Sequence, residues 1–200
     1  MARCSAAELA DRIGCRLVSQ ARLLIGVLIV VALWSSAHAD EPSVTALLKR
    51  LDLVEYRAGT KPPNFTGPVL HSRPLSLTDL RGKVVIVNFW ASWCLECRPE
   101  MPVLESLHRQ LAARGLAIVG INAREDRRAV ARYAEELRLT FPLVLDPAGE
   151  VNALYGVIGL PTTFVVGRDG RAVAFGVGAR DWQSPPARSL LEALLAEPAP

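Results

Sequence analysis

Two cysteines separated by two residues are the residues of this sequence best suited to chemistry. Cys94 and Cys97 lie in the segment Trp93-Cys94-Leu95-Glu96-Cys97, directly after a long apolar stretch. At this spacing one thiol can attack the sulfur of the other, so a mixed disulfide with another molecule can be resolved within the chain. As a structural crosslink the pair would close a very short loop and stabilise the fold by less than about 2 kcal/mol. We therefore expect a redox-active pair.

An apolar run before the cysteines and a helical pattern after them predict the elements that hold the pair. Val84–Trp90 is rich in β-branched residues, which is typical of a strand buried on both faces of a parallel sheet. The apolar residues that follow share one helical face until Gly115 ends the helix. Pro99 and Pro102 lie inside this helix, and we expect each to disturb it. The free N–H groups at the helix N-terminus would stabilise a thiolate at Cys94.

Strands and helices continue to alternate through the rest of the chain. We expect strands at 116–121 and 141–145, a helix around 130–137, a hairpin of 163–166 and 172–177, and a final helix after Ser184. This order predicts an α/β layer architecture with a mixed sheet. A short helix within 43–53 and a loop at 57–63 come first. We therefore interpret residues 40–61 as a leading segment or linker and residues 62–197 as one domain.

The first 39 residues are predicted to be an export signal. A basic region precedes the apolar run at 23–34, and the small residues Ala37 and Ala39 follow it, a pattern that fits signal-peptide cleavage before Asp40. The run is shorter than the roughly 20 apolar residues that span a membrane. An uncleaved membrane anchor formed by residues 23–34 is the alternative. In either case we expect the rest of the chain in the periplasm.

The composition is that of an ordinary globular protein, with 200 residues, 50% hydrophobic residues, 22% charged residues and a net charge of +3. These values exclude a disordered chain, and the small positive charge lacks the clustered basic face that nucleic-acid binding needs. The predicted signal carries Cys4 and Cys15, so the exported protein would keep Cys94 and Cys97 as its only cysteines. We expect no metal site, because a structural zinc ion needs four ligands and the pair has no second Cys-X-X-Cys to complete them. An inert disulfide stays open as an alternative.

The segment 88–102, which reads NFWASWCLECRPEMP, resembles the active-site segment of the TlpA/ResA-like thioredoxin-fold oxidoreductases. Residues 63–65 and 77–83 are similar to the family's N-terminal hairpin and its lead into the central strand, and residues 155–164 to the segment that carries its cis-proline. The resemblance extends from about Pro62 to the C-terminal helix. It implies a thioredoxin fold, an α/β fold whose central mixed sheet is flanked by helices and extended by an N-terminal hairpin.

The resemblance also implies roles for residues around the pair. Cys94 would be the more exposed, attacking thiol and Cys97 the resolving thiol. Pro161 would be the cis-proline that faces the disulfide, and Leu160 would pair its backbone with an extended substrate. Together with Trp93, these two residues would form the substrate-binding part of the site.

Two glutamates near the pair are expected to affect its proton chemistry. Glu100 matches the family's active-site glutamate, where a carboxylate with a pKa raised by burial can move protons between thiols. Glu96 departs from the proline that many relatives have before the second cysteine. A carboxylate there would raise the cysteine pKa and favour the disulfide form, unless Glu96 lies in solvent and is screened.

The resemblance favours an exported reductase of protein disulfides, for example in cytochrome c maturation or copper-site assembly. Electrons would come from a membrane thiol transporter of the DsbD or CcdA type, and no cofactor is expected because the sequence has no NAD or flavin fingerprint. A thiol peroxidase of the same superfold is one alternative, although Ala91 stands where such enzymes have a threonine three residues before the cysteine. A copper-delivery module that uses Cys94 and Cys97 as ligands is another.

Overall fold

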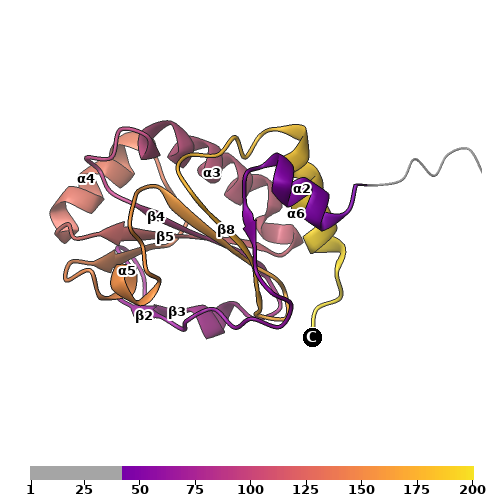
Figure 1. The fold of residues 1–200 in the computed structure, drawn as a ribbon. Helices are drawn as coiled ribbons and strands as arrows, with labels where there is room; N and C mark the ends of the chain where they lie inside the picture. Colours follow the sequence, from indigo (N-terminus) through magenta and orange to yellow (C-terminus); the bar gives the residue numbers. More distant parts are fainter. Residues whose placement is uncertain (1–41) are drawn as a thin grey trace, which may run out of the picture. The chain divides into compact units, whose positions relative to one another are not determined.

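A six-stranded mixed sheet forms the centre of the structure (Figure 1). The computed structural model describes residues 42–200, so the predicted export signal lies outside the described residues. The strands follow the order β1-β8-β7-β4-β5-β6, in which β4, β5 and β6 run parallel and β7 is antiparallel to both β4 and β8. Their bounds are β1 Val54–Glu55, β4 Val84–Trp90, β5 Leu116–Ala123, β6 Leu143–Asp146, β7 Thr162–Val166 and β8 Ala172–Val177.

The central position of β4 explains its apolar sequence. All seven residues of β4 are buried, because alternate side chains enter two different apolar clusters on the two faces of the sheet. Val84 and Ile86 pack into the first cluster, and Val85 and Val87 pack into the second. The predicted strand and its bounds are confirmed.

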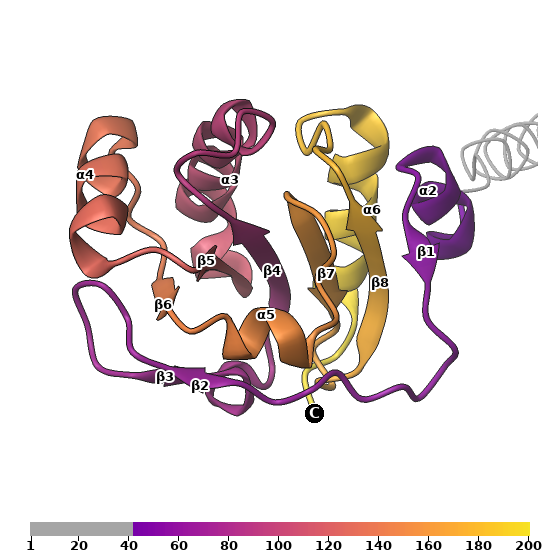
Figure 2. The ribbon, with the colours of Figure 1, turned by 60° about the vertical axis from the view of Figure 1, so that its left-hand side comes forward.

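Helices cover the first of these two faces (Figure 2). They are α2 Val44–Arg50, α3 Cys97–Leu111, α4 Arg127–Leu137 and α6 Pro185–Ala196, and their buried side chains belong to one apolar cluster. The other face is covered by a short helix, α5 Glu150–Leu154, and by the hairpin of β2 Thr66–Gly67 and β3 Leu75–Ser76. A 3₁₀ turn at Leu77–Leu80 links this hairpin to β4. The α/β fold with an N-terminal hairpin is therefore confirmed.

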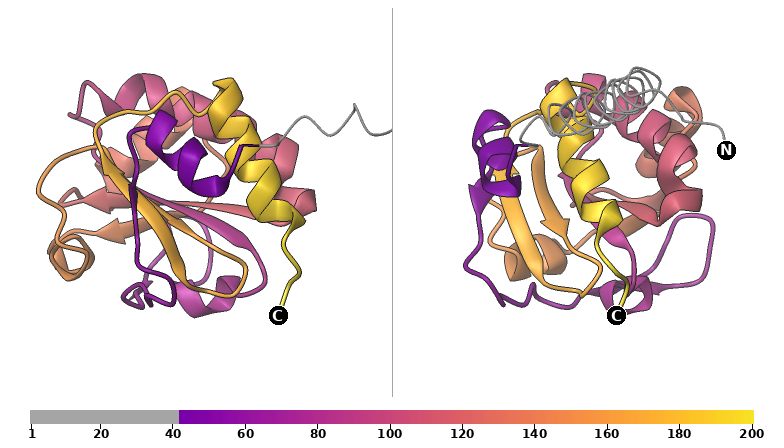
Figure 3. Two further views of the ribbon diagram at one scale, coloured as in Figure 1. Left: turned by 45° about the vertical axis from the view of Figure 1, so that its right-hand side comes forward. Right: turned by 90° about the vertical axis from the view of Figure 1, so that its right-hand side faces the viewer.

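The leading segment is joined to this sheet from Ser43 onward. Helix α2 packs beside α6 (Figure 3), and β1 pairs with the edge strand β8, where Val54 lies opposite Phe175. Residues 43–200 accordingly form one compact unit. The structure thus includes most of residues 40–61 in the domain, whereas the sequence suggested a separate leading segment before residue 62.

One local expectation differs from the structure, and one helix was not expected. Pro99 is the third residue of α3, and the N–H groups of a first helical turn have no acceptor within the helix, so proline removes no hydrogen bond there. The predicted disturbance at Pro99 is wrong, while Pro102 does lie within α3. Helix α5 was not predicted, because its five residues are too few to show a helical period.

Candidate active site

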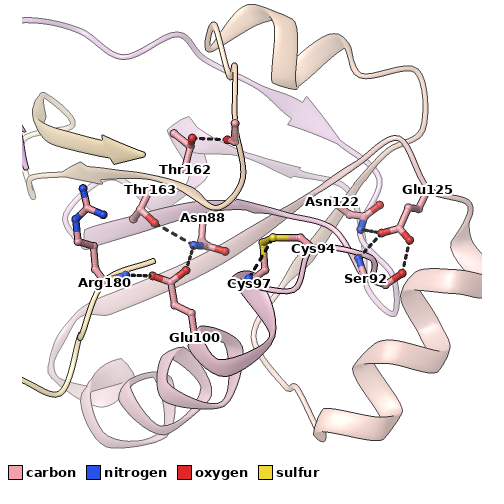
Figure 4. Close-up of a disulfide and its surroundings, with 11 residues drawn as sticks. Asn88, Ser92, Cys94, Cys97, Glu100, Asn122, Glu125, Thr162, Thr163 and Arg180 are labelled. Atoms are coloured by element: carbon pink, nitrogen blue, oxygen red, sulfur yellow. Dashed lines mark hydrogen bonds between the residues drawn. A yellow bond between two sulfur atoms is a disulfide. The ribbon is translucent and has the colours of Figure 1, made fainter. Parts of the chain in front are cut away.

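The two cysteines form a disulfide where β4 ends and α3 begins (Figure 4). The turn before the bond is closed by the N–H of Cys94, which donates to the carbonyl of Ala91 at 3.2 Å. The N–H of Cys97 donates to the Sγ of Cys94 at 3.1 Å. Because the N-terminus of α3 also carries a positive partial charge, this arrangement would stabilise a thiolate at Cys94 in the reduced protein.

The two sulfurs differ in exposure. Cys94 is 7% exposed and Cys97 is 0% exposed, so an external sulfur can approach Cys94 but not Cys97. Cys94 opens into a groove of about 880 Å³. Its lining comes from the segment around the disulfide, from the loop after β5, from α5 and from the loop before β7, with Trp93, Leu95, Glu96, Arg124, Ile158 and Leu160 among the residues that line it.

Two of the residues expected to bind substrate, Trp93 and Leu160, line this groove, and Pro161 directly follows Leu160. Leu160 lines it together with Cys94, and the peptide bond between Leu160 and Pro161 is cis. Pairing of β7 with its neighbours begins at Thr162, so Leu160 lies just outside the paired part of the sheet. The side chain of Trp93 is 67% exposed and forms an apolar wall next to Cys94, together with the exposed Ile158.

Glu100 is buried one turn after Cys97 and accepts three hydrogen bonds. The indole N–H of Trp182 and the backbone N–H of Arg180 donate to Oε1 at 2.8 and 3.1 Å, and the side-chain amide of Asn88 donates to Oε2 at 3.0 Å. Burial raises the pKa of the Glu100 carboxyl above its ordinary value, and these bonds, with the charge of Arg180, offset only part of that rise. Asn88 is fixed in turn by its bond to Thr163 Oγ1 at 2.9 Å.

Glu96 lines the groove at its exposed edge. Its side chain is exposed, and it forms no capping hydrogen bond with the first turn of α3 in the described part of the chain. A carboxylate in contact with water acts weakly on its neighbours because solvent and salt screen its charge. The structure therefore places Glu96 in the solvated arrangement, one of the two that the sequence left open.

Several residues of the site were not predicted from the sequence. Trp182 and Arg180 reach Glu100 from the loop between β8 and α6, about eighty residues further along the chain, and no local pattern marks them. Glu125 contacts Ser92, two residues before Cys94, and Asn122 contacts Glu125. Their position could have been inferred, because β4 and β5 are parallel neighbours and the carboxyl ends of such strands meet at one edge of the sheet.

A mixed sheet with a Cys-X-X-Cys disulfide between its central strand and the following helix defines a thioredoxin-like protein. Residues 58–174 match the model of a family described as the AhpC/TSA family, and the chain belongs to that family. Two curated relatives bear out the resemblance found in the sequence. The thiol-disulfide oxidoreductase ResA of Bacillus thuringiensis subsp. konkukian is 36% identical over 115 residues, which cover 58% of this chain and 66% of that protein. The ResA of Geobacillus thermodenitrificans is 40% identical over 113 residues, or 56% of this chain and 65% of that protein.

These matches span slightly less than two thirds of the relatives' lengths. Solved structures extend the similarity over nearly the whole domain. A thiol:disulfide interchange protein from Chlorobium tepidum TLS is 30% identical, with a TM-score of 0.62 over 72% of this chain and 100% of that chain. StoA from Bacillus subtilis is 27% identical, with a TM-score of 0.56 over 68% of this chain and 98% of that chain. The thioredoxin fold expected from the sequence is confirmed.

Proposed function

We propose that the protein is a thiol:disulfide oxidoreductase that reduces disulfides of exported proteins through the Cys94–Cys97 couple. The observation that carries this proposal is the disulfide itself, with its more exposed sulfur at a groove and bonded to the N–H that begins α3. The names of similar proteins, thiol-disulfide oxidoreductase and thiol:disulfide interchange protein, support the same class of reaction.

The reaction is a two-electron exchange in two steps. The Cys94 thiolate attacks one sulfur of a substrate disulfide, which forms a mixed disulfide and releases the first substrate thiol. The Cys97 sulfur then attacks Cys94, which releases the second substrate thiol and leaves the Cys94–Cys97 disulfide. The substrate gains two electrons and the protein loses them. The exposure of Cys94 and the burial of Cys97 support this order of attack.

Glu100 is the group proposed to take the proton of Cys97. Cys97 is buried and must lose its proton before it can attack, and Glu100 lies one helical turn further along α3. Because burial raises its pKa, this carboxyl exchanges a proton closer to neutral pH than an exposed glutamate does. Its three hydrogen-bond donors keep the carboxylate in one position while the proton is exchanged.

Substrate is proposed to bind as an extended segment along the groove. The backbone of Leu160 lies outside the paired strands and can form sheet-like hydrogen bonds with such a segment, next to the cis bond to Pro161. Trp93 offers an apolar surface beside Cys94 for the residues that flank the substrate cysteine. Glu96, which lines the same groove, adds a negative charge at its edge.

The proposed role is that of a reductase in cytochrome c maturation or copper-site assembly, which the resemblance of residues 88–102 to the TlpA/ResA-like oxidoreductases implies. The predicted signal at residues 1–39 supports action in the periplasm, where a membrane thiol transporter of the DsbD or CcdA type would return electrons to the couple. Within residues 42–200 no helix is both long enough and apolar enough to cross a membrane.

The test replaces each of the two cysteines in turn and compares the variants. Cys97→Ala is expected to trap a mixed disulfide between Cys94 and a disulfide-containing peptide, visible by mass spectrometry, whereas Cys94→Ala is expected to trap none. Both variants should lose insulin reduction in the presence of a thiol reductant. Full insulin reduction by Cys94→Ala would refute the proposal. Stoichiometric copper binding by the reduced protein, without any disulfide exchange, would instead favour copper delivery.

A redox titration decides the direction of electron flow. A reductase should have a potential near that of thioredoxin, about −270 mV, or below it. A value near −120 mV, which is that of a strong oxidant, would show that the protein forms disulfides and does not reduce them.

A further inference from the structure

The carboxylate of Glu125 joins the turn that carries Cys94 to the neighbouring strand (Figure 4). Glu125 lies in the loop between β5 and α4. The N–H of Ser92 donates to its Oε2 at 2.7 Å, and the hydroxyl of Ser92 donates to its Oε1. The side-chain amide of Asn122 also donates to Oε2, at 2.6 Å.

The three bonds fix the backbone just before the reactive cysteine. Ser92 lies inside the turn that the hydrogen bond from the N–H of Cys94 to the carbonyl of Ala91 closes. Its backbone N–H and its hydroxyl both donate to the carboxylate of Glu125. The third donor to Glu125, Asn122, is held in place because it is fully buried on β5 and lies opposite Trp90 of β4. Glu125 thus ties the turn before Cys94 to a fully buried residue of the sheet.

We propose that Glu125 is a positioning residue that holds the 91–94 turn in the shape that keeps Cys94 close to Cys97. The proposal rests on the proposed function, since it takes the Cys94–Cys97 couple to be redox-active. In the oxidised protein the covalent bond itself holds the sulfurs together. In the reduced protein only non-covalent contacts keep the thiols at bonding range, and the carboxylate of Glu125 supplies two contacts to the turn of Cys94 while its bond from Asn122 anchors it to β5.

This difference between the two redox states predicts a change in redox equilibrium. The tendency of two thiols to form a disulfide depends on their effective concentration, which falls when one of them is free to move. Loss of Glu125 should therefore disfavour the disulfide relative to the dithiol and make the protein a weaker reductant. A residue that merely stabilised the fold would stabilise both redox states equally and leave the equilibrium unchanged.

Glutamine provides a matched control at this position. The amide oxygen of Glu125→Gln can accept from the N–H of Ser92 and from Asn122, and its NH₂ can donate to the hydroxyl oxygen of Ser92. The variant keeps the three contacts and removes the charge, whereas Glu125→Ala removes both. Ser92→Ala removes the hydroxyl bond and keeps the backbone bond. Glu192→Ala removes an exposed acid on α6, whose partner is Arg114, and serves as a distant control.

The experiment equilibrates the full chain with glutathione buffers, in which two glutathione molecules reduce the protein disulfide and become one glutathione disulfide. The oxidised fraction is measured by alkylation of free thiols and mass spectrometry. Glu125→Ala is expected to shift the equilibrium at least tenfold toward the dithiol, which is about 30 mV for a two-electron couple. Ser92→Ala should shift it in the same direction by less, and Glu125→Gln and Glu192→Ala should stay within about twofold of wild type.

Two results would overturn the proposal. In the first, Glu125→Ala and Ser92→Ala both titrate like Glu192→Ala, which would make the contacts structural only. In the second, Glu125→Gln shifts the equilibrium as far as Glu125→Ala, which would make the charge, and not the position, responsible. If Glu125→Ala does not fold, Ser92→Ala alone tests the proposal: a shift toward the dithiol supports it, and a titration like that of Glu192→Ala refutes it. A wild-type protein without a reversible couple would refute the proposed function, and that result is distinct from both.

Discussion

Replacing Glu100 by glutamine separates its proposed proton transfer from its structural contacts. Glutamine has the same shape, and its oxygen can keep the bonds from Trp182 and Arg180. Its NH₂ would face the amide of Asn88, but the Oδ1 of Asn88 has no hydrogen-bond partner within residues 42–200 and can turn to accept it. The hydroxyl of Thr163, which now accepts from the Asn88 amide, can then donate to the same oxygen. We therefore expect the free energy of unfolding to change by less than about 1.5 kcal/mol, the net value of one hydrogen bond.

The rate of the second chemical step should change far more. General acid–base catalysis contributes about 100-fold or more to a rate, so attack by Cys97 should slow by roughly this factor, or about 2.7 kcal/mol in the barrier. The assay mixes the reduced protein with an aromatic disulfide that releases a coloured thiolate at each step. The first release, caused by Cys94, should keep its wild-type rate, and the second release should be delayed.

Glu100→Ala is the contrasting variant. It removes the acceptor of the buried indole N–H of Trp182 and of the part-buried N–H of Arg180, and it leaves the amide of Asn88 with only its bond to Thr163. Because an unsatisfied buried donor costs about 1–3 kcal/mol, we expect a loss of at least about 2 kcal/mol in stability. A Glu100→Gln variant with an unchanged second release would refute proton transfer by Glu100. Equal slowing of both releases would show a general distortion of the site.

The raised pKa of Glu100 also predicts a dependence of stability on pH. Because burial raises this pKa, the folded protein keeps a proton that the unfolded chain has already released. The free energy of unfolding should therefore fall as the pH rises from the ordinary range of glutamate through the raised pKa. Glutamine has no proton to lose, so urea denaturation of Glu100→Gln across this range should show no such decline.

Two further predictions concern stability at acid pH and substrate binding. Burial raises the pKa of Glu105, but the bonds from Thr140 and Arg109 outweigh that effect and lower it. The free energy of unfolding should therefore fall as the pH drops through the lowered pKa. Glu105→Gln should lose about 1–3 kcal/mol of stability at neutral pH and should no longer show this acid dependence in urea denaturation. Ile158 is 93% exposed at the groove, where it can contact apolar residues of a substrate. Ile158→Ser should raise KM severalfold for peptides with apolar residues beside the disulfide and leave kcat and the redox potential unchanged. An unchanged KM would exclude this contact with substrate.

The sequence predicted those elements whose pattern is local and long. The strand β4 was identified because six of its seven residues are apolar and four of them are β-branched, and α3 was identified because its apolar residues repeat with a helical period. Helix α5 was missed because its five residues are held mainly by tertiary contacts, such as the bonds from Asn152 to the carboxylate of Asp146. Strand β1 is two residues long and exists only as a partner of β8, so no periodicity can reveal it.

In the candidate site, too, the residues that are close in the sequence could be predicted and the distant ones could not. Cys94, Cys97 and Glu100 were found together because they lie within seven consecutive residues, with Cys94 just before α3 and with Cys97 and Glu100 about one turn apart on it. The donors that determine the behaviour of Glu100 could not be found, because Trp182 and Arg180 come close to it only when β8 returns beside β7. A motif thus supplies the reactive groups, and the topology supplies their environment.

The leading segment is part of that environment. The guanidinium of Arg180 donates to the carbonyls of Val177, Gly178 and Ala179 within its own loop and to the carbonyl of Asp52 at 2.8 Å, where α2 leads into β1. The backbone N–H of the same residue donates to Glu100. Residues that precede the central sheet therefore hold the loop that provides two of the three donors of Glu100, while the turn that presents Cys94 is held separately by Glu125. Because these two supports share no residue, the proton chemistry of the pair and the geometry of its attacking sulfur can be changed independently.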